Sequence, residues 1–576
     1  MEGDEEESLL GADGGEDEVN DEASSEHDFV AGETIDNYTV GNSVKPSDLG
    51  PMAYTDLGPV MGKDKGDHYF FPGVRYAESP ERFEVARQKK PWAPRVYRAT
   101  KFRAACIGAG TSEHESEDCL HLNIWVPKGG LRDMPVIVYV HGGINQHGSG
   151  SESIRRGDVI TTSSKYPTIF INLNWRLGIF GWINLNGSAL PRNLGLRDQQ
   201  TALRWVQENI RSFGGDPARV TLQGQSEGCG AILVHMVAPG SAGLFQRAVW
   251  HSPVADMWSR NANRDRTNFM VEKANCMRPN VSSTVRCLKR KHARFLWNRD
   301  WNSEELSRGV GLPSWNSQAQ RLLQFGLESK HKHELPGMLG WHAEVDNVTL
   351  LGDPTELVRQ GLFHNVTLLM TVSPNETLGV VPQATAGTAS LSLKYFLGST
   401  EAVGLYARTL EARGIRMDPV QTFYQILTDK LWTCDIRSLA ADVTRGGRRA
   451  YVGMFAHAPR YSRAGASTNL ACMFGATCHA DEMPYVLPQG PRGIRGPGME
   501  GELAFSKKYS ESFLAFVHGD DEGHPWVPYD AERQAITFYR ASGTTVVPRY
   551  RKEQCDVLDR FNGPELPRHM RDRTVR

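Results

Sequence analysis

A serine between two glycines, at the junction of two apolar runs, constrains the fold of this chain more than any other feature. Residues 224–228 read G-Q-S-E-G, after the run R-V-T-L and before C-G-A-I-L-V. The pattern predicts a strand, a sharp turn and a helix, with Ser226 at the bend. Glycines let the two backbones pass closely, and the helix N-terminus adds partial positive charge beneath the hydroxyl. The flanking runs favour a nucleophilic serine over an ordinary turn serine.

Further apolar runs predict a sheet around this turn. The run P-V-I-V-Y-V at 135–140 is apolar throughout, which is typical of a strand buried on both faces. Helical spacing at 197–213 ends at two glycines, and a last long helix is expected at 507–517. Strands are also expected at 69–77, 120–126, 168–173 and 247–250, and largely helical segments at 255–340 and 380–450. Alternating strands and helices favour an α/β fold with a large, mostly parallel, doubly wound sheet.

The charge distribution separates a tail from the body of the chain. Residues 1–44 contain 15 Asp and Glu and no Lys or Arg, whereas the formal charge of all 576 residues is −2. Such a tail cannot bury a core, so we expect residues 1–44 to be disordered and residues 45–576 to form one domain. The basic residues of the body do not form blocks, and no nucleic-acid motif is present. No nucleic-acid partner is therefore predicted.

Cysteines and sequons predict an oxidising compartment. None of the nine cysteines forms a C-x-x-C pair, and several would close short disulfide loops. N-glycosylation sequons occur at Asn37, Asn186, Asn280, Asn347 and Asn365. An extracellular or secretory location is expected, although no signal peptide is visible at the N-terminus. No apolar run approaches 18 residues, so no integral membrane segment is predicted.

A second glycine motif is a candidate oxyanion hole. The reaction of a serine with an ester requires a base, an acid that orients it, and backbone N–H groups that bind the oxyanion. His141-Gly142-Gly143-Ile144 follows the strand at 135–140. A plain glycine turn is the alternative, but the position upstream of the serine turn favours the oxyanion hole.

Several motifs resemble the type-B carboxylesterase/cholinesterase family over roughly residues 55–565. Residues 116–123 read S-E-D-C-L-H-L-N, similar to the family's S-E-D-C-L-x-L-N. Residues 193–199 resemble its N-x-G-L-x-D-Q segment, and residues 213–217 match its F-G-G-D-P. The resemblance implies an α/β-hydrolase fold with helical insertions over the active site. It also implies hydrolysis of carboxylic esters through an acyl-enzyme, without a metal or an organic cofactor.

The same resemblance implies roles for individual residues. Ser226 would be the nucleophile, His479 in G-A-T-C-H-A-D-E the base, and Glu376 in S-P-N-E-T-L the orienting carboxylate. The oxyanion hole would use Gly142, Gly143, Ile144 and the N–H of Glu227. The implied disulfides are Cys106–Cys119, Cys276–Cys287 and Cys434–Cys555, with Cys472 and Cys478 as candidates for an extra bridge and Cys229 as a buried free thiol.

Three residues depart from the family pattern. Ile144 replaces the third glycine of the oxyanion loop, and its β-branch is expected to stiffen the loop and narrow the pocket. Glu227 replaces the small alanine after the nucleophile. Its carboxylate would oppose a developing oxyanion unless the side chain turns away or is protonated. Thr377 replaces a glycine after the acid.

The substrate and partners are less constrained by the sequence. The loop between Cys106 and Cys119 contains no tryptophan, so recognition of a choline ester by a cation–π contact is disfavoured. The expected substrate is a small carboxylic ester. The alternatives are a non-catalytic, cholinesterase-like adhesion or binding protein and a sequestering protein whose serine reacts once. The resemblance also allows a homodimer through helices.

Overall fold

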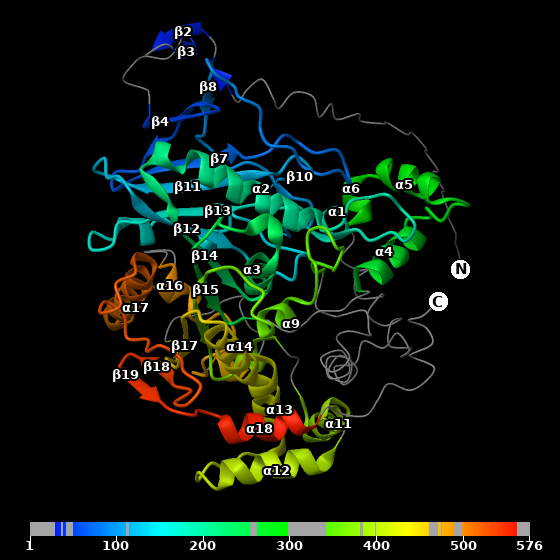
Figure 1. Cartoon of the computed structure of the whole chain (residues 1–576), viewed down its shortest axis with the longest axis vertical. Coiled ribbons are helices and arrows are strands. Elements are labelled where there is room, and N and C mark those ends of the chain that lie inside the picture. Colours follow the sequence, from blue (N-terminus) through cyan, green and yellow to red (C-terminus); the bar gives the residue numbers. More distant parts are fainter. Residues whose placement is uncertain are drawn as a thin grey trace, which may run out of the picture.

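The computed structural model describes most of the chain after residue 49. The described residues are 29–30, 32–35, 38–41, 50–110, 114–253, 262–297, 341–380, 384–397, 399–459, 470–473, 475–488 and 498–561. Within them, a large twisted sheet runs through the molecule and helices cover both of its faces (Figure 1).

The main sheet is mixed, with parallel strands in its centre. In spatial order its strands are β19 (Gly543–Val547), β18 (Ile536–Arg540), β17 (Ala450–Phe455), β16 (Thr367–Val372), β15 (Arg247–His251), β14 (Gly215–Gln225), β12 (Met134–Val140), β13 (Ile169–Leu173), β11 (His121–Pro127), β7 (His68–Arg75) and β6 (Lys63–Asp64). All neighbours from β18 to β13 pair in parallel. The pairings at the two edges are antiparallel.

Three smaller sheets accompany the main sheet in the described residues. The first contains β1 (Phe29–Val30), β8 (Val96–Arg98), β5 (Gly58–Met61) and β4 (Met52–Thr55). Two further pairs are β2 (Gly32–Ile35) with β3 (Tyr38–Gly41), and β9 (Ala105–Cys106) with β10 (Glu115–Ser116).

Helices fill the connections between the strands. Up to β16 they are α1 (Gly178–Trp182), α2 (Leu194–Asn209), α3 (Glu227–Val237), α4 (Ala262–Lys273), α5 (Val281–Lys289), α6 (Ala293–Leu296) and α9 (Pro354–Arg359). After β16 they are α10 (Glu376–Val380), α11 (Ala386–Leu397), α12 (Thr400–Glu411), α13 (Pro419–Thr428), α14 (Cys434–Arg445), α15 (Leu470–Met473), α16 (Met483–Val486), α17 (Glu500–His518) and α18 (Lys552–Arg560). A five-residue π-helix, Asp429–Thr433, joins α13 to α14.

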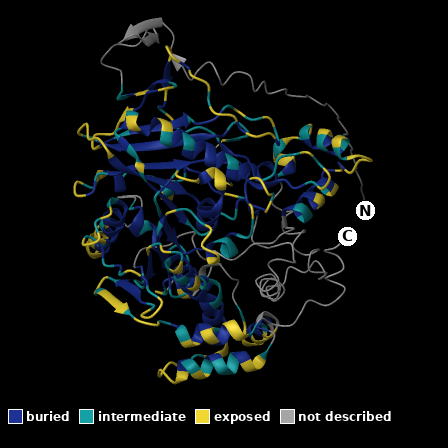
Figure 2. Ribbon diagram, viewed as in Figure 1, coloured by how far each residue is buried: buried dark blue, intermediate teal, exposed yellow. Residues whose placement is uncertain are grey.

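Alternate side chains of the sheet enter two hydrophobic cores. In β12, Val138 packs in a core with α2 and α3, whereas its neighbour Tyr139 packs in a second core with Tyr509 and Phe513 of α17. Because successive side chains of a strand point to opposite faces, the two cores lie on opposite faces of the sheet. All seven residues of β12 are buried, and Figure 2 shows the same for the other central strands. This burial explains why these strands are apolar throughout.

A third core lies away from the sheet. It contains residues of α11, α12, α13 and α18, and Figure 1 shows α12 and α18 side by side at the end of the molecule opposite β4. The disulfide between Cys434 and Cys555 ties α18 to the start of α14. A hydrogen-bonded capping box at Asp418 and Gln421 begins α13.

The strands expected at 69–77, 120–126, 135–140, 168–173 and 247–250 lie within two residues of β7, β11, β12, β13 and β15. The strand expected on the run at 219–222 is longer, because β14 begins four residues before that run and ends three residues after it. The helix expected at 507–517 begins earlier, at Glu500. The segment expected to be helical at 197–213 is α2 followed by the 3₁₀ turn Ile210–Phe213, which ends at Gly214 with φ 85°. The helical expectation for 255–340 agrees with α4, α5 and α6, while residues 255–261 and 298–340 lie outside the described residues.

The division into an acidic tail and one domain remains a prediction, because residues 1–28 lie outside the described residues. Of the segment 1–44, the structure describes only β1, β2 and β3. Among the described helices, none combines the length and apolar character that a bilayer crossing requires.

Candidate active site

The predicted residues follow the carboxyl ends of parallel strands of the main sheet. Ser226 comes directly after β14, Glu376 follows β16, and the loop that begins at His141 follows β12. His479 lies in the long connection after β17. The carboxyl ends of parallel strands meet at one edge of an α/β sheet, which is where ligands bind in such folds.

Ser226 occupies a strained turn. Its backbone has φ 55° and ψ −125°, a region that residues other than glycine rarely adopt. The Ser226 N–H donates to the His251 carbonyl at 3.0 Å, and α3 begins at the next residue. A Cβ on Gly228 would lie 2.2 Å from the carbonyl oxygen of Val140. The glycine is therefore needed for α3 to approach β12 and place its positive end beside the serine.

The second glycine motif packs directly against this turn. A Cβ on Gly142 would lie 2.6 Å from the Gln225 carbonyl oxygen and 3.0 Å from Ser226 Cβ. Gly143 has φ 116°, and a Cβ there would lie 2.1 Å from the carbonyl oxygen of His147. Both positions thus require glycine. The loop backbone lies beside the serine, as backbone donors to an oxyanion must.

Glu376 and His479 form a buried pair. Their side chains meet at 2.7 Å between Oε2 of Glu376 and Nδ1 of His479. Glu376 has no exposed surface, and its Oε1 also accepts the N–H of Ser373 at 2.6 Å. An imidazole that donates from Nδ1 presents the lone pair of its Nε2 to a partner. The pair can therefore orient a base.

The Nε2 atom of His479 is directed toward the serine turn. It lies 3.1 Å from the side-chain Nε2 of Gln225, the residue before Ser226. Among the hydrogen bonds of the described residues, His479 is paired with Gln225 and Glu376 and not with the Ser226 hydroxyl. The structure therefore brings His479 to Glu376 and to the neighbour of Ser226.

Three contacts fix the segment that contains His479. Cys472 and Cys478 form a disulfide that closes a six-residue separation. Cys478 also pairs with Asn375 in a parallel β-bridge, and the Asn375 amide donates to the Thr477 carbonyl at 3.3 Å. The loop that carries the base is thereby tied to the loop that carries the acid.

Three other buried ionisable groups near the site have pKa values shifted toward the neutral form. Burial raises the pKa of the Glu482 carboxyl well above its usual value, and the nearby charge of Glu376 adds to this. The Ser252 hydroxyl donates to Glu482 at 2.8 Å. Burial lowers the pKa of His251 to about 3 and that of His141 well below its usual value. Neither histidine is suited to accept a proton near neutral pH.

Eight cysteines form four disulfides: Cys106–Cys119, Cys276–Cys287, Cys434–Cys555 and Cys472–Cys478. These are the three pairs that the family resemblance implied, together with the candidate extra bridge. Cys229 is free and fully buried in α3, as expected. Burial raises the pKa of its thiol well above the usual value, so it behaves as a small apolar group.

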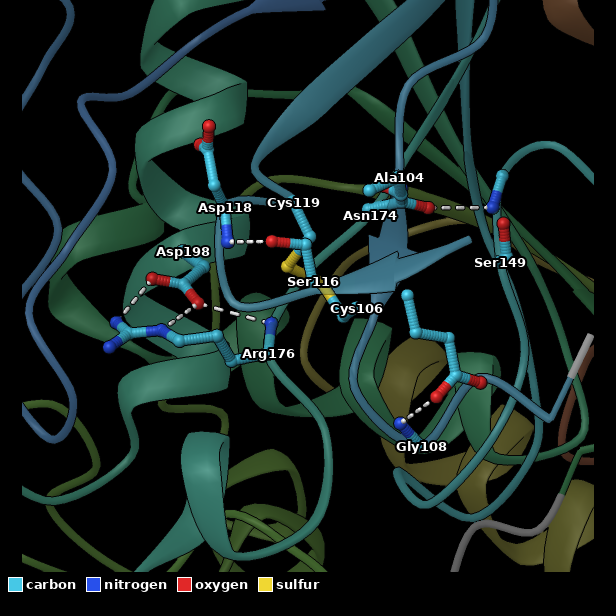
Figure 3. Close-up of a disulfide and its surroundings, with 12 residues drawn as sticks. Ala104, Cys106, Gly108, Ser116, Asp118, Cys119, Ser149, Asn174, Arg176 and Asp198 are labelled. Carbon is cyan, nitrogen blue, oxygen red and sulfur yellow. Dashed lines mark hydrogen bonds and ion pairs between the residues drawn. A yellow bond between two sulfur atoms is a disulfide. The ribbon is translucent and has the colours of Figure 1, made fainter. Parts of the chain in front are cut away.

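Two of the motifs that carry the family resemblance, at 116–123 and 193–199, form structural contacts. Figure 3 shows the disulfide that joins Cys106 to Cys119, with Asp118 beside it. The Asp118 carboxylate accepts two hydrogen bonds of 2.6 Å from the guanidinium of Arg75. In the same view, Arg176 donates to both oxygens of Asp198 at 2.7 Å. These bidentate pairs hold the segments before β11 and at the start of α2.

The sequons at Asn186, Asn280, Asn347 and Asn365 are exposed, while Asn37 lies outside the described residues. The Asn280 side chain already accepts the Ser283 N–H as the N-cap of α5. Glycosylation at these sites remains a prediction.

A profile of the carboxylesterase family matches residues 50–558, which is most of the chain. The chain belongs to the carboxylesterase family. The match includes every strand of the main sheet and all the candidate site residues.

Curated relatives of this carboxylesterase-family chain include cholinesterases and other esterases. An acetylcholinesterase of Danio rerio is 35% identical over 275 residues, which is 43% of each chain. A juvenile hormone esterase of Tribolium castaneum is 36% identical over 239 residues, or 39% of this chain and 40% of the esterase. The chain therefore matches less than half of the length of these relatives.

Solved structures show the same fold. A carboxylesterase of Geobacillus stearothermophilus superposes with a TM-score of 0.70 at 24% identity, over 88% of this chain and 99% of the other. A structure described as PNB esterase gives a TM-score of 0.68 at 23% identity with the same coverage. The carboxylesterase-family chain therefore has the α/β-hydrolase fold.

Sequence reasoning did not identify two residues that contact the candidate site. The Asn145 amide donates to the Glu227 carboxylate at 2.9 Å and to the Trp341 carbonyl at 2.7 Å. The only sequence signal for Asn145 is its position after the glycine motif, where asparagine tolerates positive φ. For Trp341, 196 residues later, the sequence carries no such signal.

Proposed function

We propose that this chain hydrolyses small carboxylic esters through an acyl-enzyme on Ser226. The observation that carries the proposal is the 2.7 Å hydrogen bond between His479 and Glu376, beside the strained turn at Ser226. Membership of the carboxylesterase family supports the same class of reaction.

In the first half of the reaction, His479 Nε2 takes the proton of the Ser226 hydroxyl while Oγ bonds to the ester carbonyl carbon. The oxyanion that forms accepts hydrogen bonds from the N–H groups of Gly143, Ile144 and Glu227, and the glycine at 142 lets this loop lie against the serine. Collapse of the intermediate breaks the bond to the leaving oxygen. That oxygen takes the proton from the imidazolium and departs as the alcohol.

In the second half, water repeats the same steps. His479 takes a proton from the water as its oxygen attacks the acyl carbon, and returns that proton to Ser226 Oγ as the acid leaves. Glu376 keeps the imidazole in one tautomer and stabilises its charged form. Before substrate binds, Gln225 occupies Nε2 of His479 at 3.1 Å. The serine–imidazole hydrogen bond tightens when the substrate complex forms.

The disulfides support a proposed cellular setting. Four bridges persist in oxidising surroundings, so we place the protein in the extracellular space or the secretory pathway. A homodimer is a further expectation, and light scattering of the purified chain measures it. The non-catalytic binding function is not favoured by any feature of the described residues.

The test combines a fluorophosphonate probe with a short-chain nitrophenyl ester, using wild type and Ser226→Ala. Wild type is expected to be labelled once per chain and to turn over the ester. In Ser226→Ala both signals fall to background, a loss of at least about 10³-fold. Labelling without turnover would indicate a sequestering protein. Absence of labelling in the folded wild type would refute the serine hydrolase and favour the binding function.

A further inference from the structure

The candidate oxyanion loop contains an unusual run of backbone angles. Gly143, Ile144 and Asn145 have φ values of 116°, 51° and 54°. Glycine adopts such angles freely, but in the other two residues Cβ crowds the carbonyl oxygen. Isoleucine is the least suited of the three, because its β-branch adds a second group to the crowded side. A strained pair of this kind persists only where surrounding contacts hold it.

Backbone contacts hold both strained residues from outside the loop. The Trp341 N–H donates to the Ile144 carbonyl at 3.0 Å, and the Gly178 N–H donates to the Asn145 carbonyl at 2.7 Å. Trp341 is itself held in place, because the next residue exchanges hydrogen bonds with Asn263 of α4 at 2.6 and 3.2 Å.

The Asn145 side chain adds a third set of contacts. This residue is 4% exposed, and its Nδ2 donates to Trp341 O at 2.7 Å and to Glu227 Oε1 at 2.9 Å. Its Oδ1 accepts the indole N–H of Trp175 at 3.3 Å. The amide nitrogen and the carbonyl oxygen of the Asn145 side chain therefore both have partners, and of these partners only Glu227 has an ionisable side chain.

Glu227 connects this loop to the nucleophile. It is the first residue of α3, directly after Ser226, and the residue is 4% exposed. Besides Asn145, the Glu227 Oε1 atom lies 3.4 Å from Nδ1 of His342. The carboxylate is thus directed at Asn145 and His342. This arrangement resolves the conflict that a negative side chain after the nucleophile would otherwise create.

We propose that Glu227 is a positioning residue, whose carboxylate holds Asn145 and so keeps the backbone of Ile144 in the geometry of the oxyanion hole. Two of the three departures from the family pattern are then one feature: Glu227 compensates for the loss of a glycine at position 144. This inference rests on the proposed function, since it assigns Glu227 a role in the same site.

The test is a double-substitution cycle of Glu227→Ala and Ile144→Gly, with kcat and KM measured on the nitrophenyl ester. Glu227→Ala is expected to lower kcat about 10- to 100-fold, because a displaced donor loses most of its stabilisation of the transition state. KM changes by less than about threefold, because the loop acts on the intermediate. Ile144→Gly in the Glu227→Ala background is expected to recover most of the lost kcat, since glycine adopts the same φ without support.

Glu227→Gln is the matched control. It keeps an oxygen that accepts from Asn145, so its kcat is expected to stay within about fivefold of wild type. Full kcat in Glu227→Ala would overturn the inference. The inference would also be overturned if the double variant lost as much kcat as Glu227→Ala alone. Such an additive result would show that the two residues act independently.

Hydrogen exchange separates the failure of this inference from the failure of the proposed function. If wild type has no turnover, the hydrolase is refuted, and the positioning role is judged on the peptide that spans residues 141–148. Its amides are expected to exchange faster in Glu227→Ala than in wild type and Glu227→Gln. Equal exchange in the three proteins would overturn the positioning role, whatever the activity.

Discussion

At the scale of single residues, the candidate site depends on which nitrogen of one imidazole carries the proton. The Glu376 carboxylate accepts at 2.7 Å from Nδ1 of His479, and a backbone N–H fixes the other carboxylate oxygen. The donor position is therefore occupied before any substrate arrives, and Nε2 is left as the acceptor. A neutral amide in place of the carboxylate would remove both the charge and the preference for one tautomer.

Glu376→Gln is accordingly expected to lower kcat by about 10³- to 10⁴-fold while the protein stays folded. Steady-state kinetics on the nitrophenyl ester measure this loss, and thermal unfolding checks the fold. In the background of Ser226→Ala the same substitution should have no further effect, because residues that act as a unit are not additive. A kcat near that of wild type would exclude Glu376 as the orienting group.

The sequence indicated the candidate catalytic residues more directly than the residues that contact them. Ser226, Glu376 and His479 were predicted because each lies in a short motif, and their roles remain a prediction. Asn145 and Trp341 were not predicted, because their contacts join positions 82 and 196 residues apart. Such contacts arise only when the strands are assembled. The sequence did flag Glu227 as a departure, but not the direction of its side chain.

At the scale of elements, the site depends on how closely α3 approaches β12. The Gly228 position leaves room for hydrogen alone, since a Cβ would lie 2.2 Å from the Val140 carbonyl oxygen. The strands were predictable because buried parallel strands are apolar throughout. The start of α17 was not, because its first turn contains Glu500 and Glu502. Glu502 is buried, and its carboxylate accepts a hydrogen bond from the Tyr485 hydroxyl and pairs with His457. The acidic residue therefore resembled a solvent-exposed position in the sequence although it lies inside the helix packing.

Gly228→Ala is expected to destabilise the protein by about 1–3 kcal/mol, because the methyl group forces α3 away from β12. Chemical unfolding measures the change, and fluorophosphonate labelling of Ser226 should slow in the same variant. Gly501→Ala in α17 is the matched control, since a Cβ there has no atom within 4 Å. That variant should gain about 0.4–1 kcal/mol. Equal effects in the two variants would show that close packing at Gly228 is unimportant.

At the scale of the whole molecule, a buried acid links stability to pH. Burial raises the pKa of Glu344 from its ordinary 4.5 to about 7. Its carboxyl accepts from the Asn184 amide at 2.6 Å and from the Asn263 N–H at 3.2 Å. The folded protein therefore binds a proton here that the unfolded chain releases at lower pH. The contribution of Glu344 to the free energy of unfolding falls as pH rises from about 4.5 to about 7. Above that range its contribution stays constant.

Glu344→Gln is expected to remove this dependence. The difference in the free energy of unfolding, variant minus wild type, should be larger at pH 8 than at pH 4 by on the order of 3 kcal/mol. Urea unfolding at several pH values measures the difference. The exposed Glu532→Gln serves as a control and should follow the wild-type curve. Parallel curves for wild type and Glu344→Gln would contradict the prediction.

The positions of the disulfides in the sequence also determine the order in which they can form during synthesis. Cys434 and Cys555 are 121 residues apart, and His479 lies between them. At a synthesis rate of about 5–20 residues per second, Cys434 emerges about 6–24 s before its partner. Cys472 and Cys478 emerge in that interval and are competing thiols for Cys434. Closure of their own small ring removes both competitors. The bond that encloses His479 can form only after residue 555 has been synthesised.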